Sequence, residues 1–172
     1  MSSNYNKLVV KLKWTLDETK VNFVNEGLPL LESFTSKDIY LVKNNVEVSK
    51  QNKSGILKDA IILKEIDGNN GNNLLCCNDK KCLVVDVDST LSVLASMGYK
   101  QLFCIDEECL EYFSDGSHVF IEYEPDLGLF LKIDNDKSFE ENIKWLKDMN
   151  IAYYENDFFV KKDELMLNKI VG

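Results

Sequence analysis

The segment Leu129-Phe130-Leu131-Lys132-Ile133-Asp134 carries the pattern that decides the fold: an apolar triplet, then a polar, an apolar and a polar residue. The same pattern occurs at Leu8-Val9-Val10-Lys11-Leu12-Lys13 and at Leu83-Val84-Val85-Asp86-Val87-Asp88. Aliphatic and aromatic residues that end in period-two alternation are typical of a β-strand. The sequence therefore predicts three related strands, one near the start, one in the middle and one in the last third of the chain.

Each of these strands is followed by residues that favour the start of a helix. They are Thr15-Leu16-Asp17-Glu18, Ser89-Thr90-Leu91-Ser92 and Ser138-Phe139-Glu140-Glu141. A hydroxyl side chain at the start and acidic residues in the first turn are helix amino-terminal signals. We expect the third helix to end near Met149 with Ile143, Trp145 and Leu146 on its apolar side.

Hairpin signals lie between the three units. Residues 61–66 and 74–77 flank Asp67-Gly68-Asn69-Asn70-Gly71, and residues 102–113 and 118–124 flank Ser114-Asp115-Gly116-Ser117. Asp-Gly between apolar runs indicates a β-hairpin. The polar stretch 49–55 is expected to be an exposed loop. The fold class predicted is α+β, a curved and mainly antiparallel β-barrel or tunnel with helices packed outside.

Length and charge narrow the class of protein. A chain of 172 residues with 45% hydrophobic residues is expected to form a single domain, residues 1–172. The net charge of −9 argues against nucleic acid or an anionic membrane as a partner. No apolar run is long enough for a membrane span and no signal segment is apparent, so we expect a cytoplasmic protein.

The five cysteines and the one histidine suggest no metal or thiol chemistry. Cys76, Cys77, Cys82, Cys104 and Cys109 contain no C-x-x-C pair, so free thiols are expected rather than zinc ligands or disulfides. His118 is expected to be packed or hydrogen-bonded rather than catalytic.

Alternation along the predicted strands places charged side chains together on one face. That face either lines the interior of a barrel as a charged cavity or is a solvated sheet surface. The side chains that share it are Lys11 and Lys13, Asp86 and Asp88, Lys132 and Asp134, and His118, Phe120, Glu122 and Glu124.

From residue 91 to residue 151 the sequence resembles the carboxy-terminal half of the CYTH domain, the family of class IV adenylate cyclases and thiamine triphosphatases. The resembling stretches are Leu94-Ala95-Ser96-Met97-Gly98-Tyr99, Ile121-Glu122-Tyr123-Glu124 and Leu127-Gly128-Leu129-Phe130-Leu131-Lys132-Ile133-Asp134. The family reads Leu-Gly-x-Phe-x-Glu-Ile-Glu in the last stretch, so Lys132 replaces the first acid and Asp134 keeps the second.

The amino-terminal half resembles the family more weakly. Where the family has Glu-x-Glu-x-Lys, this chain keeps only Lys13, and Val9 and Lys11 stand in place of the two acids. Asp86 and Asp88 are similar to the acids of a later Arg-x-Glu-x-Glu strand, and residues 61–64 to a Leu-Arg-x-Arg strand. All twenty basic residues are lysine, so no arginine can hold a phosphate in bidentate fashion.

The resemblance implies a triphosphate tunnel, in which basic residues hold a polyphosphate and carboxylates hold divalent ions. The residues implied for ligand binding are Lys11, Lys13, Lys64 and Lys132. Those implied for a metal such as magnesium or manganese are Asp86, Asp88, Glu122 and Asp134. No residue is assigned a catalytic role.

Three functions remain open at this stage. The first is a divergent CYTH-like protein, impaired in triphosphatase or cyclase chemistry, that binds an organic triphosphate or polyphosphate. The second is an active, metal-dependent triphosphatase. The third is a protein-interaction module whose acidic exterior binds a basic partner.

Overall fold

The computed structural model describes residues 8–68 and 71–172. Its elements are, in chain order, β1 (Leu8–Lys11), α1 (Leu16–Asn25), β2 (Leu30–Lys43), η2 (Lys50–Asn52), α2 (Lys53–Asp59), β3 (Ile61–Asp67), β4 (Asn73–Cys77), β5 (Lys80–Leu83), α3 (Val87–Ser96), β6 (Tyr99–Ser114), β7 (Ser117–Glu124), β8 (Gly128–Asp134), α4 (Phe139–Asp148) and α5 (Lys162–Val171). No helix in the described ranges is long and apolar enough to cross a bilayer.

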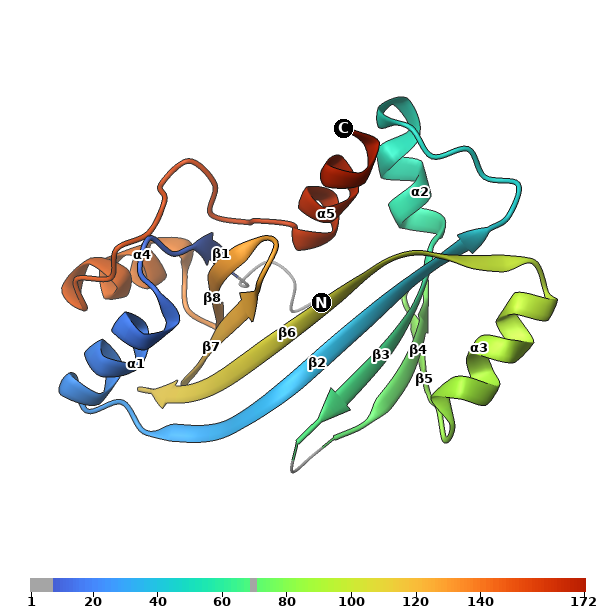
Figure 1. Cartoon of the computed structure of the whole chain (residues 1–172). Helices are drawn as coiled ribbons and strands as arrows, with labels where there is room; N and C mark the ends of the chain where they lie inside the picture. The colour runs from blue at the N-terminus through green and yellow to red at the C-terminus, as the bar shows by residue number, and fades with distance from the viewer. Residues whose placement is uncertain (1–7, 69–70) are drawn as a thin grey trace. The chain divides into compact units, whose positions relative to one another are not determined.

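The eight strands follow the order β1-β8-β7-β6-β2-β3-β4-β5 (Figure 1). The strand registers, such as that of β7 with β8 and that of β2 with β3, are antiparallel. β1 and β5 stand at the two ends of the order, which is therefore that of an open sheet. The prediction of an α+β, curved and mainly antiparallel fold is confirmed, but the sheet is not closed into a barrel, because β1 and β5 do not pair with each other in the described ranges.

The chain forms two compact units, each built from stretches that are distant in sequence. Unit 1 contains the described residues 8–33 and 108–161, and unit 2 contains 34–68, 71–107 and 162–172. β2 and β6 each contribute residues to both units.

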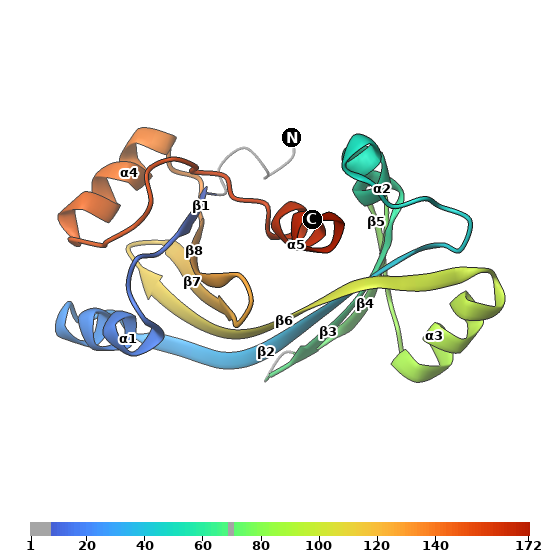
Figure 2. The ribbon, with the colours of Figure 1, turned by 45° about the horizontal axis from the view of Figure 1, so that its top comes forward.

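The core of unit 1 lies between one face of its strands and the helices α1 and α4, which are on the same side of β1 and β8 (Figure 2). Val10, Ile121 and Leu131 are fully buried there. Phe23 of α1 meets Tyr112 edge to face, with ring centroids 4.8 Å apart.

Unit 2 has apolar packing on both faces of its strands. On one face Leu41 and Leu63 pack with Leu94 of α3. On the other face Tyr40 and Phe103 stack with centroids 4.5 Å apart. α3 lies on one side of β3 and β4, and α2 and α5 lie together on the other side (Figure 2).

The local signals read from the sequence are confirmed at several elements. Thr15 and Ser138 cap α1 and α4, each in a capping box with the glutamate three residues later. α4 ends at its cap residue, Met149, as expected. β3 pairs with β4 and β6 pairs with β7, as the two hairpin signals predict. The turn between β6 and β7 has positive φ at both central residues, +48° at Asp115 and +78° at Gly116, a conformation that favours glycine.

Three expectations are wrong in detail. A strand was predicted over residues 83–88, but β5 already ends at Leu83. Asp86 caps α3, and Val87 and Asp88 belong to that helix. β1 ends at Lys11, and Lys13 follows it in a bend. The loop expected over residues 49–55 contains η2 and the first turn of α2.

Candidate functional site

The sheet of unit 1 has a charged face opposite its apolar core. Residues paired directly across neighbouring strands point to the same side of a sheet. One paired row joins Val9, Lys132, Phe120 and Glu111, and the next joins Lys11, Phe130 and Glu122. We call this side the polar face of unit 1; its side chains include Lys11, Glu111, His118, Phe120, Glu122, Phe130, Lys132 and Asp134.

Lys132 is held by two neighbours on the polar face of unit 1. Its Nζ lies 3.5 Å from Glu122 Oε2 and 4.7 Å from the ring centroid of Phe120. The Glu122 side chain is only 10% exposed and that of Lys132 is 30% exposed. A half-buried lysine beside a buried carboxylate neutralises it, and the ring adds a cation–π contact.

Lys11 and Lys13 share an aromatic neighbour at the end of β1. The Nζ atoms lie 6.0 and 5.3 Å from the ring centroid of Tyr154, which is 44% exposed. A Cβ atom on Gly128 would lie 3.0 Å from Lys11 Cε, so the glycine leaves the space that the lysine side chain crosses. Neither lysine has a carboxylate partner among the described residues.

His118 lies at the other end of this face. Its Nδ1 is 2.7 Å from Glu111 Oε1, and its strand neighbour on β8 is Asp134. The ring also contacts Phe113 edge to face at 5.4 Å. The expectation of a hydrogen-bonded histidine is confirmed.

The Glu124 side chain is hydrogen-bonded within the turn between β7 and β8. Its Oε2 accepts hydrogen bonds from the backbone amides of Asp126 and Leu127, at 2.7 and 2.6 Å. The side chain is therefore part of the turn that sets the register of the two site-bearing strands.

In unit 2 two ion pairs lie on the side of the strands that faces α5, the side that also carries Tyr40. Lys64 Nζ donates to Asp38 Oδ2 at 3.0 Å, and Lys162 Nζ lies 2.5 Å from Glu107 Oε2. Glu107 is buried and Lys162 is nearly so, with side chains 7% and 16% exposed. Burial and the nearby Asp163 raise the pKa of Tyr40 far above its ordinary value.

Asp86 is engaged by its own helix. Its Oδ1 accepts from the backbone amides of Asp88 and Ser89, and its Oδ2 accepts from Ser89 Oγ at 2.8 Å. These hydrogen bonds, that of the Ser89 hydroxyl first, lower the pKa of the Asp86 carboxyl. Both oxygens are thus used for capping, and Asp88 lies in the first turn of the same helix.

The structure divides the predicted site residues between the units. Unit 1 holds Lys11, Lys13, Glu122, Lys132 and Asp134, and unit 2 holds Lys64, Asp86 and Asp88. The expected lining of one tunnel by residues of both groups stays a prediction.

The predicted metal ligands fit a divalent ion poorly within either unit. Glu122 is beside a lysine ammonium, which repels a cation, and Asp86 is used as a helix cap. Over residues 8–68 and 71–172 no group of three or more His, Cys, Asp or Glu side chains is arranged to hold a metal ion.

Four charged residues of the two faces were missed by the sequence analysis. Alternation with the apolar residues of β2 and β6 could have placed Asp38, Glu107 and Glu111. Lys162 carries no such signal, because its partner Glu107 is 55 residues away along the chain.

Comparison with solved structures identifies the fold. The chain is similar to the PH1819 protein from Pyrococcus horikoshii OT3, with a TM-score of 0.71 and 20% identity over 95% of this chain and 96% of that one. A candidate adenylate cyclase from Vibrio parahaemolyticus gives a TM-score of 0.60 and 16% identity over 93% and 97% of the two chains.

A candidate adenylyl cyclase from Hippeastrum, for which a dominant triphosphatase activity is described, gives a TM-score of 0.59 and 10% identity over 95% and 94%. No family model and no curated protein sequence matches the chain. The fold is therefore CYTH-like.

Proposed function

We propose that this protein binds a triphosphate or polyphosphate on its CYTH-like scaffold and hydrolyses it at or near background. The observation that carries the proposal is the ion pair between Lys132 and Glu122. Lys132 neutralises a carboxylate that could otherwise attract a divalent ion, while Lys11 of the same face and Lys13 after β1 stay available to an anion.

Lys11 and Lys13 are the ligand-binding residues that we propose first. Both are exposed, and Tyr154 holds the two ammonium groups near one ring. Two cations beside one ring favour an extended anion with several charged oxygens, because each phosphate can accept from a different ammonium. Lys132 and Lys64 contribute less in this proposal, because each already has a carboxylate partner.

The second candidate is an active metal-dependent triphosphatase. The triphosphatase activity described for the structurally similar Hippeastrum protein favours it. In this case Asp134, which has no ion pair in the described ranges, would be expected to act with magnesium or manganese. A protein-interaction module is a third outcome, supported by the net charge of −9.

Calorimetric titration with tripolyphosphate, thiamine triphosphate and ATP tests binding, and phosphate release with magnesium or manganese tests turnover. We expect saturable binding of at least one of the three compounds and release close to that of the buffer. The double variant Lys11→Met/Lys13→Met should weaken binding roughly tenfold or more, the loss expected for charge-assisted hydrogen bonds.

Lys20→Met is the matched control, since Lys20 is an exposed lysine on α1 away from the polar face. An equal loss in the control and the double variant would contradict the assignment of Lys11 and Lys13. Robust metal-dependent hydrolysis that Asp134→Asn abolishes would establish the second candidate. Absence of binding by all three compounds would leave the interaction module as the better explanation.

A further inference from the structure

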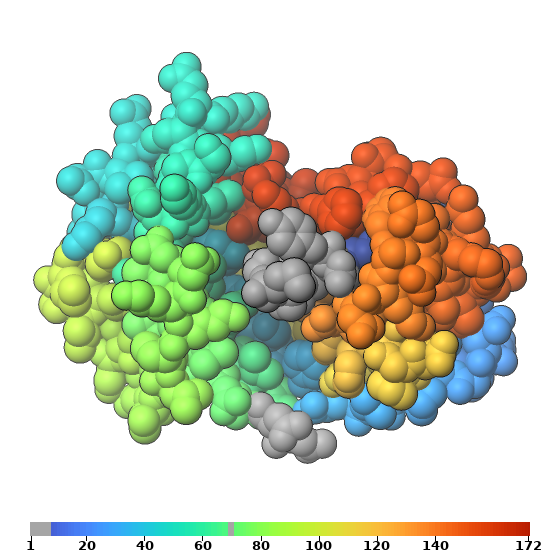
Figure 3. Space-filling view, turned by 180° about the vertical axis from the view of Figure 1, so that it is seen from behind, coloured from blue at the N-terminus to red at the C-terminus, as the bar shows by residue number. Residues whose placement is uncertain are grey.

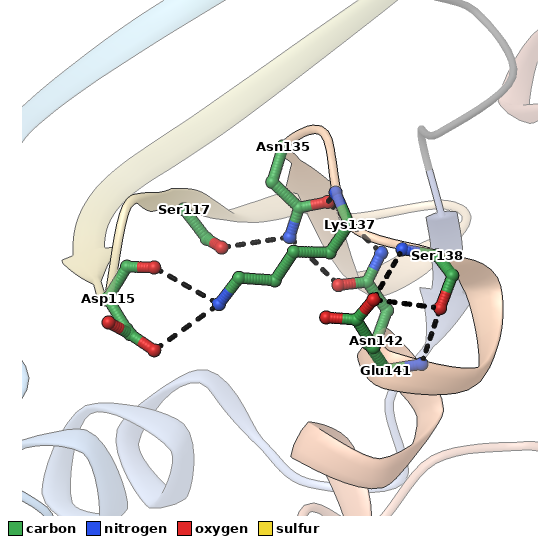
Figure 4. A network of polar contacts seen from close by, with 7 residues as sticks. All are labelled: Asp115, Ser117, Asn135, Lys137, Ser138, Glu141 and Asn142. Atoms are coloured by element: carbon green, nitrogen blue, oxygen red, sulfur yellow. Dashed lines mark hydrogen bonds and ion pairs between the residues drawn. The ribbon is translucent and has the colours of Figure 1, made fainter.

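Unit 1 contains a cavity that lies apart from the polar face. It has a volume of about 220 Å³ and lies between α4 and the ends of β7 and β8 (Figure 4). Its apolar wall includes Val119 and Ile133, which belong to the core side of the sheet. At roughly 30 Å³ for each water molecule, it has room for about seven waters or one small organic ligand.

A part-buried pair of asparagine amides forms the polar wall of this cavity. Asn135 Nδ2 donates to Asn142 Oδ1 at 2.8 Å, and Asn142 Nδ2 donates back to Asn135 Oδ1 at 3.2 Å. Asn142 is only 3% exposed. The reciprocal pair holds both amide groups in one orientation, so the wall is rigid before any ligand arrives.

Two side chains of this wall, Asn142 and Ser117, have a hydrogen-bond donor that none of their contacts in the wall uses. Asn135 Nδ2 donates its second hydrogen to Ser117 Oγ at 2.8 Å, and Asn135 Oδ1 also accepts from the Lys137 backbone amide. Asn135 is therefore satisfied. Asn142 keeps one amide hydrogen and Ser117 keeps its hydroxyl hydrogen, because neither makes a further hydrogen bond within the described residues.

Lys137 adds a cation to the same wall. Its Nζ donates to the backbone oxygen of Asp115 at 3.1 Å and lies 3.4 Å from the Asp115 carboxylate, which is 94% exposed. Two acceptors leave one of three ammonium hydrogens unused. The Lys137 side chain is 31% exposed, and the β6–β7 turn and the β8–α4 loop that position it are neighbours at the surface (Figure 3).

The acids of the rim have partners of their own. Glu141 Oε1 accepts from Ser138 in the capping box, and Asp148 Oδ2 accepts from Lys144 Nζ at 2.9 Å. The Lys144 and Asp148 side chains are well exposed, so water screens their charges. Lys137 is therefore the lining lysine that is not paired with an acid of the rim, and Glu141 is a lining acid whose partner there is neutral.

From these contacts we propose that the cavity binds a small carboxylate with a compact apolar body. The carboxylate accepts from Lys137 Nζ, Ser117 Oγ and Asn142 Nδ2, and the apolar body lies against Trp145 and the two aliphatic residues of the wall. Three residues with unused donors in the lining of one cavity suit an anionic oxygen group, and an apolar back wall suits a carbon body.

The test is a titration of the full-length protein with benzoate, followed by the ¹H–¹⁵N signals of the two tryptophan indoles. Trp145 lines the cavity, and Trp14 packs against the core elsewhere and serves as an internal reference. We expect a saturable shift of the Trp145 signal alone. Benzamide has the same ring and a neutral head group, so it should bind at least roughly tenfold more weakly.

Two variants assign the carboxylate contact. Lys137→Met should weaken benzoate binding roughly tenfold and leave benzamide unchanged, whereas Lys147→Met, an exposed lysine of α4 outside the cavity, should change neither. Ser117→Ala should give a smaller loss with the fold intact. No saturable shift of Trp145, equal affinity for benzamide, or no loss in Lys137→Met would each overturn the proposal. None of these results depends on triphosphate binding at Lys11 and Lys13.

Discussion

Lys132 illustrates how one side chain determines the chemistry available to its neighbours. Glu122 is nearly buried, and an ionised carboxylate there needs a positive partner to offset its lost hydration. A divalent ion or an ammonium can meet that need, and in this chain the ammonium of Lys132 lies within 3.5 Å. Charge compensation without a metal ion is thus observed for this pair, whereas Lys11 and Lys13 have no carboxylate partner among the described residues.

We predict that Lys132→Met destabilises the fold by roughly 1–3 kcal/mol, less than for a fully buried pair because the Lys132 side chain is 30% exposed. Lys20→Met should change the free energy of unfolding by no more than about 0.5 kcal/mol. Adding Glu122→Gln to Lys132→Met should recover part of the loss, measured by denaturant unfolding. Additive effects, together with a large rise of melting temperature on adding magnesium or manganese, would instead indicate a retained metal site.

Cys104 provides a second prediction at the scale of one residue. Burial, with a smaller contribution from Asp106, raises the pKa of its thiol to about 11. The thiolate is the reacting form, so Cys104 should be alkylated by iodoacetamide at neutral pH far more slowly than the exposed Cys77 and Cys82. Peptide mass spectrometry over time measures this order, and modification of Cys104 as fast as Cys77 would contradict it.

At the scale of elements, the sequence predicted best where local pattern and tertiary packing agree. β7 and β8 alternate clearly, because one face packs on a core and the other carries charge. At Asp86 the same alternation was misleading, since the carboxylate bonds two backbone amides ahead of it and starts α3. α5 was not predicted: its buried Met166 and Leu167 need the rest of unit 2 to pack against.

The site was predictable to a similar extent and for similar reasons. Period-two alternation placed Lys132 and Glu122 on one face, and their ion pair follows from their adjacent rows on β8 and β7. Alternation cannot show which acid a lysine contacts when the partner comes from a distant element. This limit explains why the pair of Lys162 with Glu107 was missed.

The cap of α3 should make that helix sensitive to acid. Hydrogen bonds to Ser89 and Asp88 lower the pKa of Asp86 in the folded state. A lowered folded pKa gives stability that is present above the unfolded pKa and is lost as pH falls through the folded pKa. The protection of the first-turn amides of α3, taken relative to their intrinsic exchange rates at each pH, should therefore fall in strongly acidic buffer.

Two substitutions of Asp86 separate capping from titration. Asp86→Ala should speed exchange in the first turn of α3 at neutral pH, because no side-chain acceptor remains. Asp86→Asn keeps an acceptor without an ionisable group, so the protection of these amides should be close to wild type at neutral pH and should not fall in acid. Asp88→Asn is the control, and an equal response of Asp88→Asn would show that the cap is not responsible.

At the scale of the whole molecule, the chain passes between the two units three times, after residues 33, 107 and 161. Each unit therefore needs segments from both parts of the sequence, and α5 completes unit 2 after the chain has finished unit 1. Two of the crossings occur inside β2 and β6, which continue as regular strands. A strand that continues through both units couples their unfolding, because fraying one part removes the ordered backbone from which the other extends.

We predict that the protein unfolds in one cooperative transition, as the sequence-based expectation of a single domain requires. Leu167→Ala in α5 and Leu146→Ala in α4 are a matched pair, because both leucines are fully buried and they lie in different units. Each should cost about 2–5 kcal/mol, the usual range for a buried leucine replaced by alanine. If unfolding is shared, each variant lowers the midpoint of the same transition and accelerates amide exchange in both units, seen in β3 and β7 alike. Denaturant unfolding followed by far-ultraviolet circular dichroism measures the midpoint, and mass spectrometry measures the amide exchange.

Two separable unfolding transitions would contradict this prediction. In that case Leu167→Ala would shift only the transition of unit 2 and Leu146→Ala only that of unit 1, and the two units would be independent domains.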